Sequence, residues 1–345
     1  MRVSESVRAL GLTGFGLLST GAAILCIAIA PHEALTGWLA AAVMVQAVPL
    51  GGLVLLAMMR LIPGPWEEEL RFPCEAAAGL WVLAALAFLP VLIGVGVIYD
   101  WPGASPGTAF QEVWLGLLPF ALRTLLWFVA LALIARSQVG GRASQGASAL
   151  ALVVMTFGTS LLAVDWLMSI GTQFNSSGFG LQVFALEMCV AYTVIVLLRL
   201  IHPPAPRSPG VLGALLLLFL LVWVYFQSMP YLVIWSGNLP DGAQWYLDRS
   251  YGGWVWALYA IGALGFLPLL ALLLPQVRGS PRALAYAAIF ALAGKVLEFA
   301  WFAVPGRGGM AVLAYLFALG GLGAFATAFL WPGWTWWPPG RRTAA

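Results

Sequence analysis

Charged side chains are scarce in this 345-residue sequence, where they make up 8% of the residues, against 62% that are hydrophobic. A soluble globular domain carries roughly 25% charged residues, so the composition excludes an ordinary soluble domain. The formal net charge of +3 gives no sign of a nucleic-acid-binding surface. So much apolar surface requires burial in a bilayer as well as in a protein core, which indicates a membrane protein.

Histidine and cysteine, which commonly hold metals and haems, are also few. His32 and His202 fall in loops on opposite faces of the predicted protein, so they cannot share one haem or metal ion. Cys26, Cys74 and Cys189 are isolated and lack C-x-x-C spacing. A P-loop, a dinucleotide-binding fingerprint and a nucleophile elbow are missing too. We therefore expect no cofactor bound covalently or through metal ligands.

Long apolar runs recur along the whole chain. A helix needs about 20 apolar residues to cross a hydrocarbon core of about 30 Å, and backbone groups in lipid must pair within the chain. The sequence therefore predicts an all-α membrane protein with a single integral domain over residues 1–345. The first run follows two arginines as a secretory signal would, but it exceeds the usual 7–15 apolar residues of such a signal. About ten spans are predicted, at 9–30, 37–59, 76–98, 110–135, 147–170, 179–201, 210–236, 252–274, 283–303 and 310–331.

The distribution of cations predicts the orientation. Of 16 Lys and Arg residues, only Arg249 and Arg307 fall in one set of loops, and Arg123 and Lys295 lie inside spans. Because short cationic loops stay in the cytoplasm, both termini are expected there. Four tryptophans within 331–337 resemble an interfacial aromatic belt. The remaining twelve cations, all in the other set of ends and loops, are Arg2, Arg8, Arg60, Arg71, Arg136, Arg142, Arg199, Arg207, Arg278, Arg282, Arg341 and Arg342.

Five charged residues lie well inside the predicted spans, about five or more residues from either end: Arg123, Asp165, Glu187, Lys295 and Glu298. A lone charge at the bilayer centre costs about 2.5–3.5 kcal/mol on insertion scales, so these side chains are expected to face the interior and to pair. Arg123 and Lys295 are expected near the midplane, with Asp165 and Glu187 nearer the outer surface. Glu298 follows Lys295 by three residues and shares its helical face.

Two interpretations of these charges remain open. In the first, Lys295 and Glu298 neutralise each other or Arg123 and lock the positions of helices. In the second, Asp165, Glu187 and Glu298 relay protons, with Arg123 and Lys295 tuning them, or a cation binds a polar head group. Asp165 can instead satisfy loop amides where its helix ends, so Glu187 is the better relay candidate of the two.

Pro230 interrupts the seventh apolar run. A proline removes one backbone hydrogen bond inside a helix and should kink it, and Gln227 and Ser228 are placed to re-satisfy the freed groups. Broken membrane helices often line ligand sites, so packing and ligand binding are both open for this segment.

Two stretches together resemble one family of bacterial membrane subunits. AVDWLMSI (163–170), followed by FGLQVFA (179–185), resembles the D-W-x-M-S segment of NrfD-like polysulfide-reductase membrane subunits. YLVIWSGNLPDGAQWYLDR (231–249) is similar to the I-W-x-x-N-L-P-E-E-x-x-W-Y-x-x-R segment of ActF, a smaller subunit of this kind in the quinol:cytochrome c oxidoreductase called alternative complex III. The matching positions are Asp165, Trp166, Met168, Ser169, Trp235, Asn238, Leu239, Pro240, Trp245, Tyr246 and Arg249.

The chain departs from the family pattern in three places. GTQFNSS (171–177) stands where the family has an acidic-Pro-His-Trp run, Asp241-Gly242 replaces a double Glu, and Met229-Pro230 replaces Ser-Gln. The sequence is therefore interpreted as a divergent branch, whose lost outer-loop histidine and acid alter docking to partners outside the membrane.

The resemblance implies ten helices in two four-helix bundles, here about 37–170 and 179–303, with peripheral helices 9–30 and 310–331. It implies a multi-pass, non-catalytic subunit of a quinol-oxidising respiratory complex in the bacterial inner membrane. The implied partners are a multihaem cytochrome, an iron–sulfur protein and a larger NrfD-like subunit. The chain would scaffold them and contribute a quinone site or a proton path, without a redox centre of its own.

A secondary transporter of a small solute or ion is the alternative function. Buried charges and a broken helix suit a transporter equally well. No convincing pair of inverted repeats is found. A transporter is expected to be active alone in liposomes, whereas a subunit is expected to co-purify with haem and iron–sulfur proteins.

Overall fold

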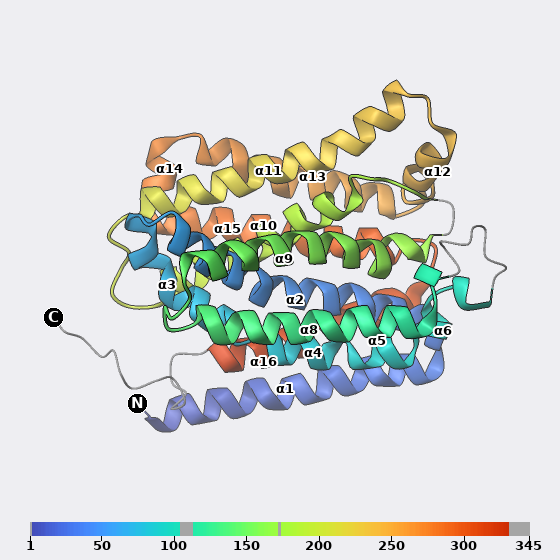
Figure 1. The fold of residues 1–345 in the computed structure, drawn as a ribbon, viewed down its shortest axis with the longest axis horizontal. Coiled ribbons are helices and arrows are strands. Elements are labelled where there is room, and N and C mark those ends of the chain that lie inside the picture. The colour runs from blue at the N-terminus through green and yellow to red at the C-terminus, as the bar shows by residue number, and fades with distance from the viewer. Residues whose placement is uncertain (1, 104–112, 172–173, 331–345) are drawn as a thin grey trace.

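The computed structural model describes residues 2–103, 113–171 and 174–330 (Figure 1). Within these ranges every regular element is a helix, which confirms the predicted all-α fold. Ten helical segments of 19 to 31 residues in the described part of the chain are long and apolar enough to cross a bilayer, and each overlaps one predicted run. The tail tryptophans, Arg341 and Arg342 lie outside the described residues.

The helices follow one another with short connections, as the Pro- and Gly-rich loops allow. Their bounds are α1 (Arg2–Ile29), α2 (Pro31–Leu61), α3 (Pro65–Ala78), α4 (Trp81–Ala87), α5 (Leu89–Ile93), α6 (Val95–Ile98), η1 (Trp101–Gly103), α8 (Leu117–Gln138), α9 (Gln145–Trp166), η2 (Met168–Ile170), α10 (Phe179–Ile201), α11 (Pro209–Ser236), α12 (Pro240–Asp248), α13 (Trp254–Leu272), α14 (Pro275–Gly279), α15 (Pro281–Ala303) and α16 (Gly309–Leu330).

Helix α2 lies at the centre of the molecule, with 94% of its most apolar stretch buried. It contacts α3, α9, α10, α15 and α16. Glycines allow this close packing, because a Cβ added at Gly37 would lie 2.0 Å from the Ala311 carbonyl oxygen and one at Gly51 would lie 2.1 Å from the Ala191 Cβ. Since α2 contacts helices from both proposed ranges, the division into two bundles stays a prediction.

Helices α1 and α16 run side by side next to α2 (Figure 1). Ser19 in α1 donates a hydrogen bond to the Phe317 carbonyl oxygen of α16 at 2.8 Å. Much of the remaining surface of α1 is apolar and exposed, including Leu17 and Leu18. Such a surface is expected of a helix that faces lipid.

The third span is not the single helix predicted at 76–98. It begins earlier, at Pro65, and consists of α3, α4 and α5, with the short helix α6 following it. The chain breaks around Gly79, Phe88 and Gly94. Pro90 lies in the first turn of α5, where its missing N–H needs no partner. The proline therefore favours a new helix start over continuation of α4.

Successive spans alternate in direction, so the loops gather at two ends (Figure 1). One end holds α3 and α14, and the other holds α6 and α12. At the first, buried Glu69 forms an ion pair with Arg199 at 2.6 Å and accepts backbone N–H bonds from Arg207 and Ser208. This end is called the arginine-rich end here, after Arg60, Arg71, Arg136, Arg142, Arg199, Arg207, Arg278 and Arg282.

The close contact at Gly37 predicts a large effect of one methyl group. Gly37→Ala should destabilise the protein by about 1–3 kcal/mol, because the neighbouring atom is backbone and cannot rotate away. Gly323→Ala in α16 is the matched control, since a Cβ there meets no atom within 4 Å. Thermal unfolding in detergent measures both. Equal melting temperatures for the two variants would contradict the packing described for α2.

Candidate functional site

The charged side chains of the spans face the protein interior. Asp165 and Lys295 are fully buried, and Glu187 and Glu298 are at most 3% exposed. The side chain of Arg123 is 20% exposed. They form three separate groups rather than one continuous network.

The first group is an ion pair between α8 and the last turn of α9. Arg123 Nε donates to Asp165 Oδ2 at 2.6 Å, and its Nη2 donates to Oδ1 at 3.1 Å. Trp114 Nε1 donates to the same Oδ1 at 2.9 Å. The sequence left two roles open for Asp165, pairing with a charge or binding loop amides, and the structure shows it paired with Arg123. Paired, planar N–H donors of this kind match a carboxylate well.

The expected depth of Arg123 is wrong. Helix α8 begins at Leu117, so Arg123 lies in its second turn, about 9 Å from the helix start at 1.5 Å per residue. The run 110–135 includes residues that precede the helix, and the count from its start therefore placed Arg123 too deep. The arginine lies near the end of the bundle that is opposite to the arginine-rich end.

The second group is centred on Glu298 in α15. Lys295 Nζ lies 2.8 Å from Glu298 Oε2, as their shared helical face predicts. Trp223 Nε1 donates to both carboxylate oxygens, at 2.9 and 3.0 Å, and Gln227 Nε2 donates to Oε1. The ammonium also lies 2.9 Å from the centroid of the Trp223 ring. This geometry favours the locking interpretation, because donors from α11 and α15 already occupy the carboxylate.

Gln227 extends this group towards α10. Its Oε1 accepts a hydrogen bond from Gln182, while Ser228 Oγ donates to the Tyr225 carbonyl oxygen at 3.1 Å. The expectation that these side chains serve the Phe226 carbonyl freed by Pro230 is therefore wrong, because Gln227 bonds side chains of other helices and Ser228 bonds the Tyr225 carbonyl. Helix α11 continues through Pro230 to Ser236.

The third group surrounds Glu187 in α10. Gln46 Nε2 donates to Glu187 Oε1 at 2.5 Å, and Gln46 Oε1 accepts from Trp127 Nε1 at 3.1 Å. Within the described ranges, Glu187 Oε2 has no hydrogen-bond partner and no ion pair includes this residue. Glu187 is thus buried with a neutral neighbour, and the expected pairing with a charge is absent there.

Side-chain hydrogen bonds between described residues do not connect Asp165, Glu187 and Glu298 to one another. A proton path through all three carboxylates therefore stays a prediction. It would require bridging groups in addition to these side chains.

The first family-like motif forms the end of α9. Trp166 is buried, donates to Thr124 Oγ1 at 3.1 Å and lies 4.3 Å from the Phe88 ring. Ser169 Oγ donates to the Asp165 carbonyl oxygen at 2.5 Å, and Met168 packs against the core. Together with the Asp165 ion pair, these contacts give the motif a structural role.

The second motif stops one helix and starts the next. Asn238 adopts φ +47°, and the Leu239 N–H donates to the Ile234 carbonyl oxygen at 3.1 Å, as in a Schellman helix end. Pro240 then opens α12, where its missing N–H costs nothing. This turn folds α12 back towards α15.

Trp245 and Arg249 anchor α12. The Trp245 ring stacks on Phe174 at 4.4 Å, and the Arg249 guanidinium lies 3.9 Å from the centroid of the Trp245 ring. Arg249 also donates to the carbonyl oxygens of Trp245 and Phe302. Tyr246, between them, is different: its hydroxyl is buried next to the Gln182 side chain and forms no hydrogen bond of standard geometry among the described residues. Burial raises the pKa of Tyr246 to about 12.

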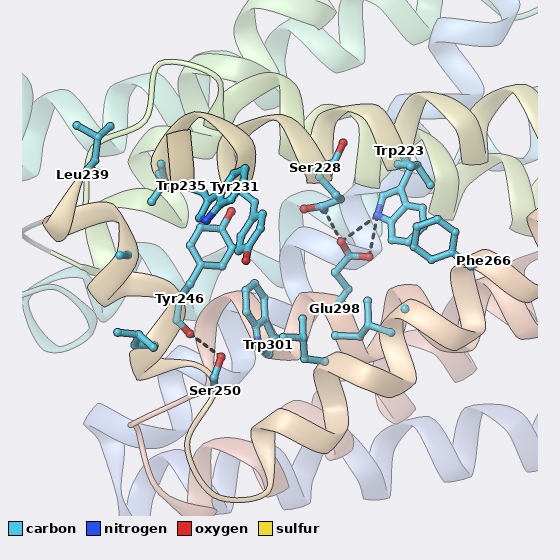
Figure 2. A pocket seen from close by; sticks show the side chains of 18 of the residues that line it. Trp223, Ser228, Tyr231, Trp235, Leu239, Tyr246, Ser250, Phe266, Glu298 and Trp301 are labelled. Carbon is cyan, nitrogen blue, oxygen red and sulfur yellow. Dashed lines mark hydrogen bonds between the residues drawn. The ribbon is translucent and has the colours of Figure 1, made fainter. Parts of the chain in front are cut away.

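A cavity of about 690 Å³ lies between α11, α12, α13 and α15. Figure 2 shows Glu298 and Trp223 towards one end of it and Tyr231, Trp235 and Tyr246 grouped towards the other. Trp301 and Phe266 add further aromatic walls. Most lining atoms are therefore carbon, with a few hydroxyls, amides and one carboxylate.

Some predicted residues line this cavity and others do not. Glu298, Trp235, Asn238 and Pro240 line it, and Lys295 lies directly behind Glu298. Arg123, Asp165 and Glu187 are not among its lining residues. The main residues that sequence reasoning did not single out are Trp223, Tyr231, Phe266 and Trp301.

No family model matches the chain, and no curated protein matches it either. The fold defines an all-α, multi-pass membrane protein.

The buried ion pair predicts a distinctive stability pattern. Lys295→Met should destabilise the protein by about 3–5 kcal/mol, because it leaves the Glu298 carboxylate buried without its cation. The double variant Lys295→Met/Glu298→Gln should recover most of that loss, since the glutamine is neutral and still accepts from Trp223. Thermal unfolding measures both variants, with exposed Arg142→Gln as the charge-removal control. A double variant as unstable as the single one would show that the pair does not lock these helices.

Proposed function

We propose that this chain is an integral membrane subunit of a quinol-oxidising electron-transfer complex, and that the cavity between α11 and α15 binds the ring of a quinone or quinol. The observation that carries the proposal is the cavity itself. The resemblance of its α11–α12 wall to a subunit of such complexes agrees with it.

The size and walls of the cavity suit an aromatic ring with an apolar tail. Its volume of about 690 Å³ lies within the range of small-molecule sites, about 300–1,000 Å³. Trp223, Phe266 and Trp301 offer flat faces on which a ring can pack. Exposed Tyr231 and Trp235 lead from the cavity to the helix surface, where an isoprenoid tail would meet lipid.

The polar groups of the cavity are few and spaced apart. Gln227 and Glu298 lie at one end, and Tyr246 with its buried hydroxyl lies towards the other. Since its pKa is about 12, Tyr246 keeps its proton at neutral pH. A rotation of its side chain that exposes the buried hydroxyl to the cavity lets it donate to a quinone carbonyl oxygen or accept from a quinol hydroxyl. Tyr246 therefore orients the ring, while Glu298 fixes the opposite wall through Lys295 and Trp223.

The proposal includes a location and partners. The arginine-rich end and both termini are cytoplasmic, by the positive-inside rule, in the bacterial inner membrane. The cavity then opens nearer the periplasmic side, where a multihaem cytochrome and an iron–sulfur protein accept electrons and a larger NrfD-like subunit lies alongside. This chain scaffolds those subunits and positions the quinol ring.

Filling the cavity should remove bound quinone without unfolding the protein. A Cβ at Gly262 meets no atom within 4 Å, and Gly262 lines the cavity, so Gly262→Phe places its ring in the empty space. The complex purified with this variant should hold at least about tenfold less extractable quinone than wild type. Gly323→Phe, at an equally open helical position away from the cavity, is the matched control.

Three results would contradict the proposed function. They are wild-type protein that contains no quinone, purification without haem or iron–sulfur proteins, and solute uptake by the chain alone in liposomes. The third result would establish the transporter instead.

Removing the Tyr246 hydroxyl should affect binding and leave folding intact. Because this hydroxyl forms no hydrogen bond of standard geometry to a described residue, Tyr246→Phe should change the melting temperature little. Quinone affinity should fall about three- to tenfold, which is the usual contribution of one hydrogen bond. Quinone titration followed by tryptophan fluorescence measures the affinity. Unchanged affinity would exclude Tyr246 as a ring contact.

A further inference from the structure

A second cavity, of about 390 Å³, lies at the end opposite the arginine-rich end. It is formed where α12, α15 and η2 end, and it shares no lining residue with the first cavity. Arg249 and Arg307 line it together with Asp248 and Tyr251. These are the two arginines of the sparsely charged loops, and both line the same space.

Neither guanidinium forms an ion pair within 4.0 Å in the described part of the chain, although Asp248 acts on Arg249 from a longer distance. The ion pairs recorded there include neither Arg249 nor Arg307. Arg249 is nevertheless only 9% exposed. Burial lowers the pKa of Arg249 to about 10; the nearby charge of Asp248 opposes this lowering, and that of Arg307 adds to it. Buried charges in proteins are normally paired, so a counter-ion from outside the chain would complete this site.

The acidic residues near the cavity have other partners. Asp248 accepts a hydrogen bond from Gln244 at 2.6 Å. Glu33 accepts from the Met310 backbone N–H at 3.3 Å, and Asp100 lies 3.9 Å from the His32 ring. These carboxylates reduce the local positive potential, yet none of them lies within ion-pair distance of the two guanidiniums.

Both guanidiniums retain unused donors. Arg249 makes long hydrogen bonds of 3.3 and 3.4 Å to the Phe302 carbonyl oxygen and one of 3.2 Å to that of Trp245. Arg307 donates to the Ile170 carbonyl oxygen at 3.1 Å and lies 3.1 Å from His32 Nε2. A guanidinium has five N–H donors, so each side chain can bind an additional acceptor. The carbonyl oxygens at the ends of α12 and α15 compensate only part of the charge.

We propose that this second cavity binds a phosphate group between Arg249 and Arg307. Planar guanidinium groups bind phosphate oxygens through paired, charge-assisted hydrogen bonds. The cavity lies where membrane helices end, which is the level of phospholipid head groups, and exposed Tyr251 beside it suits that interface. The phosphate is that of an anionic phospholipid or free inorganic phosphate, because the chemistry of recognition is the same. This inference does not depend on the quinone site.

The experiment uses delipidated full-length protein in detergent. One arm adds phosphatidylglycerol, with diacylglycerol as the phosphate-free control, and counts bound lipids by native mass spectrometry. The other arm titrates inorganic phosphate and follows the melting temperature. Binding in either arm is expected for wild type, and the responding arm identifies the source of the phosphate.

Two variants with opposite expected effects guard against simple misfolding. Arg307→Gln should weaken phosphate binding at least about tenfold, because it removes a charged hydrogen-bond donor. Asp248→Asn should strengthen binding, because it removes a competing negative charge and keeps the acceptor for Gln244. Exposed Arg142→Gln, at the other end, should bind like wild type.

No binding in both arms would overturn the proposal, and so would equal affinities for wild type, Arg307→Gln and Asp248→Asn. Quinone content should be unchanged in Arg307→Gln, so failure of the phosphate site leaves the quinone proposal standing, and the reverse also holds.

Discussion

The buried contact between Lys295 and Glu298 is the interaction on which the larger cavity depends. A charge in a bilayer core is costly unless it is paired, and here the pair recruits Trp223 and Gln227 from the neighbouring helix. Those bonds hold α11 against α15 at the end of the cavity where Glu298 and Trp223 lie. The Asn238–Pro240 turn then folds α12 back over the opposite end of the cavity, where Tyr246 lies. The cavity is thus bounded at one end by the Lys295–Glu298 ion pair and at the other by the turn between α11 and α12.

The sequence predicted the membrane spans best, because the thickness of the bilayer fixes how many apolar residues each helix needs. All ten spans could be predicted because each must supply enough apolar residues to cross the hydrocarbon core. Local spacing also predicted the Lys295–Glu298 pair, since residues three apart share a helix face. The third span was placed less well, because Pro90 and the glycines around it divide one apolar run into several helices.

Features that require distant helices to meet could not be read from the sequence. Arg123 and Asp165 are 42 positions apart, and nothing local shows that they bond. The cavity likewise depends on how α11, α13 and α15 diverge. One signal was present, because Trp223, Gln227 and Tyr231 recur every four residues and so form one face of α11. Glu187 shows the opposite case, since its buried position was expected but its neutral partner Gln46 was not.

A photoreactive quinone, followed by mapping of the labelled peptides in the complex purified with its native partners, tests the account most directly. The account predicts labelling within α11, α12, α13 and the end of α15, which together surround the cavity. It also predicts that excess unlabelled quinone prevents this labelling. Labelling confined to other helices, or none that unlabelled quinone displaces, would contradict the claim that this chain holds a quinone ring between α11 and α15.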